Sequence, residues 1–371
     1  MPNRLHINTL YVKPDTIKLW CLFVVLLFLA GFRWDVGIDW ASYMGLGERA
    51  AFNMRIEPAN LAIKLLLYRS GFTDGGYWLW IMAFLILFFF FYSFWKYSVA
   101  PLFSAVLFVC LGPFFDSLNG VRQYVAVALF VYSWQFIFKK QPVRYLIVLG
   151  VGALFHQSII FMLPFYRLST IKYNRRVLII LCAIFLPLSF VSDALLPRLM
   201  ALFPQYSVYE DMSFAVGGGN VLSLLRMVFP LFLFVIIMKV YDSIIEDRVR
   251  RILCNLSIFS IFITVLFPSI TLAIRIGFYF QMAFLFLIPL LCRYMTKENA
   301  FAFKMICVGY GIGFVYFTQI SKPIAKIWPF QLDFRLMDGN LLWILLQTFL
   351  CVLLFLVVVQ KLFVKKKSVD L

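Results

Sequence analysis

The stretch from Asn119 to Pro164 reads NGVRQYVAVALFVYSWQFIFKKQPVRYLIVLGVGALFHQSIIFMLP. Arg122 and Gln123 open an apolar helix that ends in two lysines, and a second apolar segment follows with His156 near its middle. An arginine or a histidine against hydrocarbon is costly, so such residues usually face a protein interior or a wet cavity. We therefore expect the rest of the chain to build a cavity around this stretch.

The composition is that of a polytopic membrane protein. Of the 371 residues, 63% are hydrophobic and 14% are charged, and the mean hydropathy is +0.92. Soluble domains carry about a quarter charged residues. Apolar runs recur at the length that crosses roughly 30 Å of hydrocarbon, and the first has no signal-peptide cleavage site. We predict one all-α integral membrane domain, residues 1–371.

Ten runs between short polar connections are predicted to cross the membrane. They are Ile17–Phe32, Tyr77–Phe94, Val99–Phe114, Arg122–Phe138, Val177–Val191, Val221–Met238, Ile252–Ala273, Ile276–Cys292, Phe301–Thr318 and Leu341–Gln360. A single crossing by residues 145–168 would put basic residues on both sides of the membrane. We therefore predict a re-entrant pair of short helices there, of about a dozen residues each, that turns back near His156.

The charge pattern sets the orientation. The formal net charge is +17, and this topology places most of the 34 Lys and Arg on one side. That bias is typical of the cytoplasmic side, so we expect both termini there and no nucleic-acid partner. Connections 33–76, 192–220 and 321–340 are then outer loops, the first with interfacial helices broken at Pro58. The seven cysteines lie in predicted spans and indicate neither disulfides nor a metal site.

Unusual polar residues collect at the predicted outer face. They are Arg33, Asp35, Asp39, Arg122, Gln123, His156, Arg226 and Arg275. Arginines at membrane depth outnumber acids there, and guanidinium groups match phosphate oxygens, so a lipid diphosphate is the expected ligand. Each arginine could instead snorkel, or pair with a carbonyl or an aspartate.

The other candidates have alternatives as well. His156 could be a general base on a sugar hydroxyl, a hydrogen-bond donor to phosphate, or a structural residue that holds the turn. Asp35 and Asp39 share a helical face if that segment is helical, and could bind sugar, act as a base, pair with an arginine or stay solvated. Glu57 precedes Pro58 and indicates a helix start.

Five motifs together resemble a known family. RWDVGIDWASY, Glu57-Pro58, GVRQYVAVALF, ALFHQSIIFMLP and RIGFYF, in this order, are similar to the EpsG-like bacterial polysaccharide polymerases, which are related to the Wzy O-antigen and capsule polymerases. The resemblance covers residues 30–290, and RQ-x-x-A-x-A and LFH-x-S are its most specific parts. Gly37, Asp39 and Tyr43 fit the family's first loop, whereas the spacing of Arg33 fits less well.

The resemblance implies a GT-C-type glycosyltransferase of the bacterial inner membrane. Such enzymes join undecaprenyl-diphosphate-linked repeat units on the outer side of that membrane, without a metal or other cofactor, and a chain-length regulator is a conceivable protein partner. We assign catalysis to His156, Arg122, Arg275 and Asp39, and substrate binding to Arg226, Gln123, Arg33, Asp35 and Tyr279. A lipid-linked glycan transporter, a membrane O-acyltransferase for cell-surface sugars and a non-catalytic assembly subunit remain alternatives.

Overall fold

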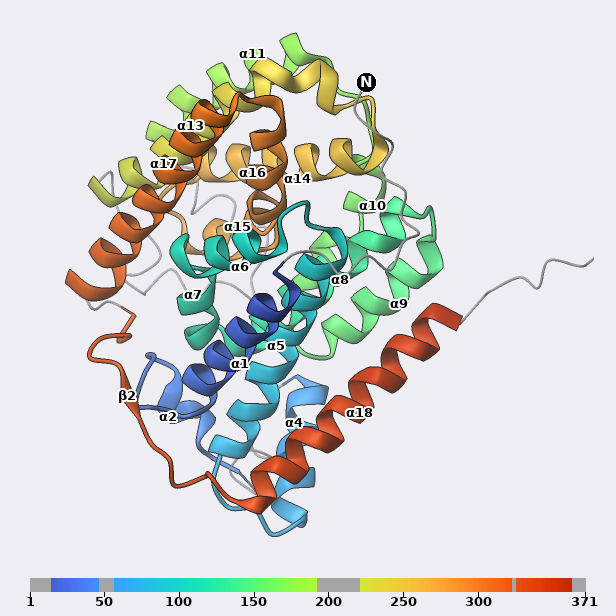
Figure 1. Ribbon diagram of the computed structural model, residues 1–371, viewed down its shortest axis with the longest axis vertical. Coiled ribbons are helices and arrows are strands. Elements are labelled where there is room, and N and C mark those ends of the chain that lie inside the picture. The colour runs from blue at the N-terminus through green and yellow to red at the C-terminus, as the bar shows by residue number, and fades with distance from the viewer. Residues whose placement is uncertain (1–14, 47–56, 192–220, 322–324, 362–371) are drawn as a thin grey trace, which may run out of the picture.

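The computed structural model describes residues 15–46, 57–191, 221–321 and 325–361, and their regular structure is almost entirely helical (Figure 1). The chain is thus an all-α polytopic membrane protein, as predicted. Within these described residues, five helices are long and apolar enough to cross a membrane, or seven if each of two bent pairs counts as one crossing. Ten crossings and cytoplasmic ends stay predictions, and loop 192–220 and both chain ends lie outside the described residues.

One helix occupies the centre of the molecule. It is α8, Val121–Phe138, and every residue in it except Arg122 and Phe138 is buried. A helix that is apolar on all sides must be surrounded by other elements. Helices α5 (Gly76–Tyr97), α9 (Pro142–Ala153), α14 (Arg248–Leu266) and α15 (Thr271–Gln281) pack around it (Figure 1).

The remaining elements cover this centre. They are α1 (Thr16–Gly31), α2 (Trp40–Tyr43), α4 (Pro58–Arg69), α6 (Pro101–Cys110), α7 (Pro113–Asn119), α10 (Phe165–Leu168), α11 (Arg175–Leu188), α13 (Val221–Ile244), α16 (Phe284–Leu291), α17 (Lys297–Val315) and α18 (Gly339–Lys361), with 3-10 turns at Gln157–Met162, Ser189–Val191 and Cys292–Tyr294 and a π-helical turn at Tyr316–Ser321. Helix α18 crosses the face of α5 and α9 and is largely exposed on its outer side (Figure 1).

Two spans that we predicted to be straight are bent. The span Val99–Phe114 is wrong, because α6 ends at Cys110 and α7 continues at 56° to it as far as Asn119. Gly112 makes the bend with φ of 102°, a conformation that suits glycine, and Pro113 starts the next helix. Most of the polar connection that we predicted at 116–120 is therefore helical.

The second bend changes the setting of Arg275. Helix α14 stops at Leu266, short of the predicted end at Ala273. Helix α15 then begins at Thr271 and meets α16 at 45°. Arg275 consequently lies inside a helix and not between two spans, so its backbone is fixed.

The chain turns back at His156, as predicted. Helix α9 ends at Ala153, and His156 has extended backbone angles, φ −160° and ψ 120°. The Tyr145 hydroxyl donates to the carbonyl of Met162 at 2.6 Å, so the returning chain lies against the start of α9. The second arm differs from the prediction: it is a 3-10 turn and the four-residue α10, not a dozen-residue α-helix.

Two of the predicted outer loops meet at Asn119, the last residue of α7. Its side chain accepts from the amide of Ile38 at 2.7 Å and donates to the carbonyl of Ala325 at 3.0 Å. Beside it, strands β1 (Arg33–Trp34) and β2 (Gln331–Leu332) form an antiparallel pair. Loops far apart in sequence are thus fixed to one helix end, directly before α8.

The contact between α17 and α6 gives a test of the packing. A Cβ added to Gly311 would approach the backbone oxygen of Cys110 to 2.5 Å. We expect Gly311→Ala to destabilise the protein by about 1–3 kcal/mol, because the two helices must separate. A lower melting temperature in detergent would show this loss.

The matched control is Gly313→Ala in the same helix. No described atom lies within 4 Å of the Cβ position at Gly313. Alanine there should leave the melting temperature unchanged or raise it slightly, since alanine favours helix. Equal melting temperatures for the two variants would contradict the close approach of α17 and α6.

Candidate functional site

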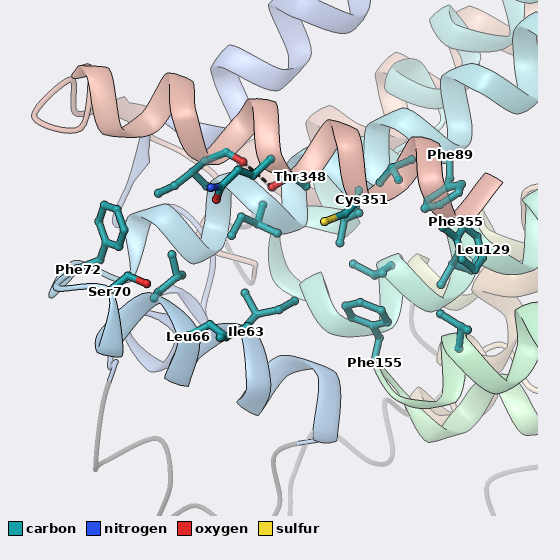
Figure 2. A pocket seen from close by; sticks show the side chains of 18 residues that line it. Ile63, Leu66, Ser70, Phe72, Phe89, Leu129, Phe155, Thr348, Cys351 and Phe355 are labelled. Carbon is teal, nitrogen blue, oxygen red and sulfur yellow. Dashed lines mark hydrogen bonds between the residues drawn. The ribbon is translucent and has the colours of Figure 1, made fainter. Parts of the chain in front are cut away.

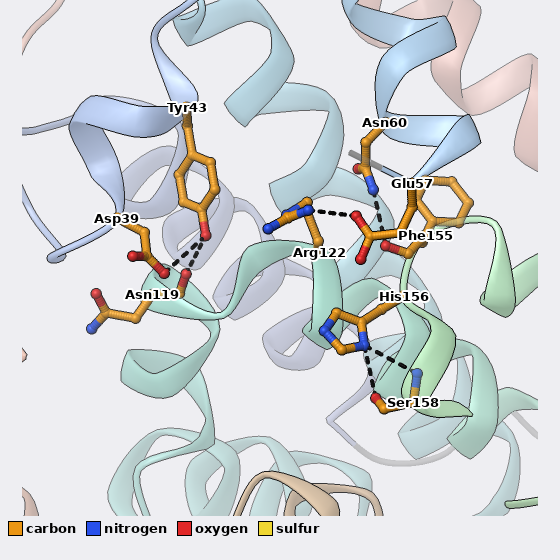
Figure 3. Close-up of polar contacts among 9 residues, drawn as sticks. All are labelled: Asp39, Tyr43, Glu57, Asn60, Asn119, Arg122, Phe155, His156 and Ser158. Carbon is orange, nitrogen blue, oxygen red and sulfur yellow. Dashed lines mark hydrogen bonds and ion pairs between the residues drawn. The ribbon is translucent and has the colours of Figure 1, made fainter. Parts of the chain in front are cut away.

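The candidate site lies where α8 emerges from the protein interior. In the first turn of this buried helix, Arg122 is the one residue that is not buried. Around its guanidinium lie Tyr43 from α2, Glu57 at the start of α4 and His156 from the turn after α9 (Figure 3). Three segments that are distant in sequence therefore converge on the opening of one buried helix.

Arg122 is held by Glu57, an acid that we predicted to begin a helix but did not assign to the site. Its Nη1 lies 2.5 Å from Oε2 of Glu57, whose side chain is 12% exposed. Glu57 does precede the first residue of α4, Pro58, as predicted, and a carboxylate is stabilised at a helix N-terminus. Among the described residues only Nη1 of Arg122 has a partner. The guanidinium therefore keeps further donors for a ligand.

The first turn of α4 also holds the turn that carries His156. The amide of Ala59 donates to the carbonyl of Leu154 at 3.0 Å, and Nδ2 of Asn60 donates to the carbonyl of Phe155 at 2.9 Å. The first amides of a helix and the last carbonyls of a helix have no partner within it. Here the ends of α4 and α9 satisfy each other. The short run Glu57–Asn60 thus positions both Arg122 and His156.

His156 has a defined tautomer. The amide of Ser158, which can only donate, points at Nδ1 of His156 at 3.3 Å, so Nδ1 is an acceptor and the proton of the neutral ring is on Nε2. The hydroxyl of Ser158 lies 2.8 Å from the same nitrogen and 2.8 Å from the hydroxyl of Tyr279. Tyr279 is fully buried. It lies behind Ser158 and His156, so it acts on the site by holding them.

The surroundings keep His156 neutral. Burial, together with the charges of Arg122 and Arg275, lowers the pKa of its imidazole to about 4. A neutral ring with Nδ1 occupied offers one group to a ligand, the Nε2–H. The arrangement fits a hydrogen-bond donor better than a general base.

Arg275 joins Arg122 at this site. The side chain of Gln123 donates to the backbone carbonyl of Arg275 at 2.8 Å and so ties α8 to α15. The Arg275 side chain is exposed and has no ion-pair or hydrogen-bond partner within the described parts of the chain. The structure therefore brings Arg122, Gln123, His156 and Arg275 together, with Gln123 in a positioning role.

The first outer loop adds Asp39. Its exposed carboxylate accepts from the Tyr43 hydroxyl at 3.4 Å, and the same hydroxyl donates to the Asn119 carbonyl at 2.5 Å (Figure 3). Lys64 of α4 holds this loop in place, because its buried ammonium donates to the carbonyls of Tyr43 and Gly45. Asp39 thus lies at the edge of the cluster.

Asp35 does not share a helical face with Asp39, because the segment between them is not helical and the condition of that prediction is not met. Helix α2 begins only at Trp40, and the chain before it turns through Asp35 at φ 50° and Gly37 at φ 100°. A Cβ on Gly37 would come within 3.1 Å of the Leu118 carbonyl as well. The carboxylate of Asp35 instead pairs with Lys326 at 2.7 Å. It joins two outer loops.

Arg33 is a structural residue in this conformation. It is 4% exposed and donates to the carbonyls of Ala30 at 2.6 Å and Leu118 at 3.2 Å. Burial lowers its pKa to about 10. The guanidinium thus satisfies carbonyls at the C-terminal ends of α1 and α7. This agrees with the alternative that Arg33 pairs with backbone carbonyls and does not bind a ligand.

Arg226 lines a cavity that includes neither Arg122 nor Arg275. This cavity of about 190 Å³ is lined by Asp116, Arg226, Gln281 and Tyr310 among others. Arg226 donates to the carbonyl of Pro268 at 3.4 Å. Helix α15 contributes Ile274, Phe278 and Gln281 to this cavity, but not Arg275. The structure therefore does not assemble all three arginines around one ligand.

The sequence did not identify several residues of the site at Arg122 and of the cavity at Arg226. Glu57, Asn60, Ser158 and Asp116 each gain their importance from a partner that is far away in sequence. The one available signal was the Glu57-Pro58 pair among the motifs. Across the described residues, no three His, Cys, Asp or Glu side chains form a group that could hold a metal ion.

Comparison with known proteins gives one match. The family model described as the EpsG family matches residues 17–332, which contain every residue of the site. No curated protein and no solved structure matches the chain. The match agrees with the resemblance carried by the five sequence motifs.

The shifted pKa of His156 predicts a pH-dependent stability. The folded value of about 4 lies below the ordinary 6.5, so the unfolded chain binds more protons between these values. Stability should therefore fall as the pH drops from 6.5 towards 4, by up to about 3 kcal/mol at about 1.4 kcal/mol per pKa unit. Melting temperatures in detergent across this range would measure the loss.

The control is His156→Gln, which has no titrating group at this position. Its melting temperature should fall less steeply over the same pH range, because only the other titrating groups contribute. Parallel curves for the two proteins would mean that His156 does not resist protonation in the folded state.

Proposed function

Because the chain belongs to the EpsG family of polysaccharide-biosynthesis membrane proteins, we propose that it is a glycosyltransferase that polymerises lipid-linked oligosaccharides. Its donor is a growing glycan on undecaprenyl diphosphate, and its acceptor is a new repeat unit on the same carrier. The protein works in the bacterial inner membrane, with the site facing outward. The product is an O-antigen, capsule or exopolysaccharide chain.

The observation that supports this proposal most is the convergence of Arg122, Arg275 and a neutral His156. The Arg122 guanidinium and the His156 ring lie close together (Figure 3), and Arg275 is near enough for its charge to act on His156. Among the described residues a single carboxylate, that of Glu57, pairs with Arg122. Such a set suits a dianionic group, because bidentate guanidinium contacts to phosphate oxygens are strong. Donors that are fixed in advance stabilise charge as it develops on a leaving group.

The reaction assigns each group a role. A hydroxyl oxygen of the acceptor sugar forms a bond to the anomeric carbon of the donor, while the bond from that carbon to the diphosphate oxygen breaks. The electron pair leaves with undecaprenyl diphosphate, which Arg122 and Arg275 neutralise. The Nε2–H of His156 donates to the diphosphate oxygen or to the acceptor hydroxyl. The hydroxyl proton passes to a carboxylate, for which Asp39 is the exposed candidate.

The arginines can be tested by glycan profile. Arg122→Ala and Arg275→Ala should each lower polymerisation by about 100- to 1,000-fold, the usual cost of losing one donor to a charged transition state. Cells with either variant should accumulate single repeat units on the lipid carrier outside the membrane. Arg122→Lys should retain part of the activity, because it keeps the charge but loses the fork.

Arg293→Ala is the matched control, since Arg293 is an exposed arginine outside the site. All variants should be compared at equal membrane abundance. Normal chain lengths from Arg122→Ala would contradict the site. Absence of lipid-linked repeats from the outer face would instead indicate a transporter.

The role of His156 can be separated with two amides. Gln places its NH₂ group near the position of Nε2, whereas Asn places its amide near Nδ1. If the Nε2–H donates to the substrate, His156→Gln should keep more transfer activity in a membrane assay than His156→Asn or His156→Ala. Equal and complete loss in all three would favour a general base at Nε2 and contradict the donor role.

A further inference from the structure

A second feature of the outer half of the molecule is a large apolar cavity. It has a volume of about 400 Å³ and lies between α18 on one side and α4, α5, α8 and α9 on the other (Figure 2). Its walls are almost wholly apolar, with Ile63, Leu129, Phe155 and Phe355 among them. The hydroxyl of Thr348, one of its few polar groups, donates to the Ile344 carbonyl within its own helix. Such walls suit hydrocarbon and not a sugar.

This cavity adjoins the polar site along α8. Arg122, Val125 and Leu129 are spaced i, i+3 and i+7, so they share one face of the helix. Arg122 belongs to the polar site, and Val125 and Leu129 line the cavity. One helix face therefore presents a cation at its outer end and apolar side chains on the next turns.

Helix α4 repeats this pattern. Asn60, Ile63 and Leu67 are again spaced i, i+3 and i+7. Asn60 holds the turn that carries His156, while Ile63 and Leu67 line the cavity. On both α4 and α8, the helix face that lines the cavity therefore leads directly to the polar site.

Phe155 marks the boundary between the two compartments. Its ring lines the cavity, its carbonyl accepts from Asn60, and the next residue in the chain is His156 (Figures 2 and 3). A molecule that reached from one compartment to the other would pass this ring. It would carry its charge at Arg122 and His156 and its hydrocarbon beyond Phe155.

The length of the cavity favours a chain. The lining residues of α18 run from Ile344 to Phe355, which corresponds to about 16 Å at 1.5 Å per residue. A single extended hydrocarbon chain fits a channel of this shape, and the arginines beside it suit one head group of high negative charge.

We propose that this cavity binds the first isoprenoid units of the polyprenyl diphosphate whose head group lies at Arg122 and Arg275. This inference rests on the proposed function for the identity of the head group. The remaining units extend into the bilayer past α18. The cavity thereby places the reacting diphosphate at a fixed depth and excludes water from one side of it.

A photocrosslinking experiment tests the cavity directly. The probe is a polyprenyl diphosphate with a diazirine on its second isoprenoid unit, added to the purified protein in nanodiscs. We expect crosslinks on the segments 63–72 and 344–355, mapped by mass spectrometry. Thr348→Trp should reduce these crosslinks about tenfold, because the indole fills the channel. Cys351→Phe is a second variant that fills the same channel.

The matched control is Leu350→Trp, on the same helix but 55% exposed on the outer face. It should leave the crosslinks unchanged. Equal labelling of Thr348→Trp and wild type, labelling confined to the outer face of α18, or equal competition by phosphatidylglycerol would each overturn the proposal. The last result would mean a general lipid site.

A transfer assay with lipid-linked repeat units separates this inference from the proposed function. If wild type transfers glycan but crosslinks elsewhere, the cavity assignment is wrong and the glycosyltransferase stands. If the cavity is labelled specifically but no glycan is transferred, the polyprenyl site stands and the enzyme proposal is wrong.

Discussion

The candidate site depends on two helix ends that satisfy each other. Helix α9 stops at Ala153 in apolar surroundings, and the carbonyls that follow must find donors. The start of α4 supplies them, through the amide of Ala59 to Leu154 and the side chain of Asn60 to Phe155. A break in a membrane helix is thus compensated by protein and not by water. Glu57 directly precedes this first turn of α4, and its carboxylate pairs with the Arg122 guanidinium, so the start of α4 orients Arg122 as well.

This arrangement explains why charge is tolerated at the start of the almost completely buried helix α8. Arg122 has one carboxylate partner, and Arg33 has two carbonyls, so neither guanidinium is buried without compensation. Arg275 differs, because it remains exposed beside them. Two guanidinium groups and one carboxylate leave an excess of positive charge at Arg122 and Arg275, which a bound anion would offset. Arg226 and the acid Asp116 line a separate cavity. The charge of Arg226 is therefore offset there and not at the candidate site.

The sequence revealed most of what local patterns encode. The composition predicted a membrane protein. The turn at His156 was predicted because a single crossing by residues 145–168 would place basic residues on both sides of the membrane. The bends at Gly112 and after Gln281 were missed, because both runs are continuously apolar and periodicity does not show where the backbone changes direction. The partners of the site were missed for another reason. Glu57 and Arg122, or Ser158 and Tyr279, are joined only by tertiary packing.

The fixed tautomer of His156 constrains where the proton of the acceptor hydroxyl can go. An imidazole whose Nδ1 already accepts from the Ser158 amide, and whose Nε2 carries the proton, has no free lone pair in the ring plane. It can polarise a substrate oxygen but cannot take up a proton unless it turns away from Ser158. Turning would break the contacts with Ser158, whose hydroxyl also meets the buried Tyr279. Glu57 is neutralised by Arg122. In the proposed reaction we therefore assign proton uptake to the exposed carboxylate of Asp39, and stabilisation of the reacting oxygen to His156.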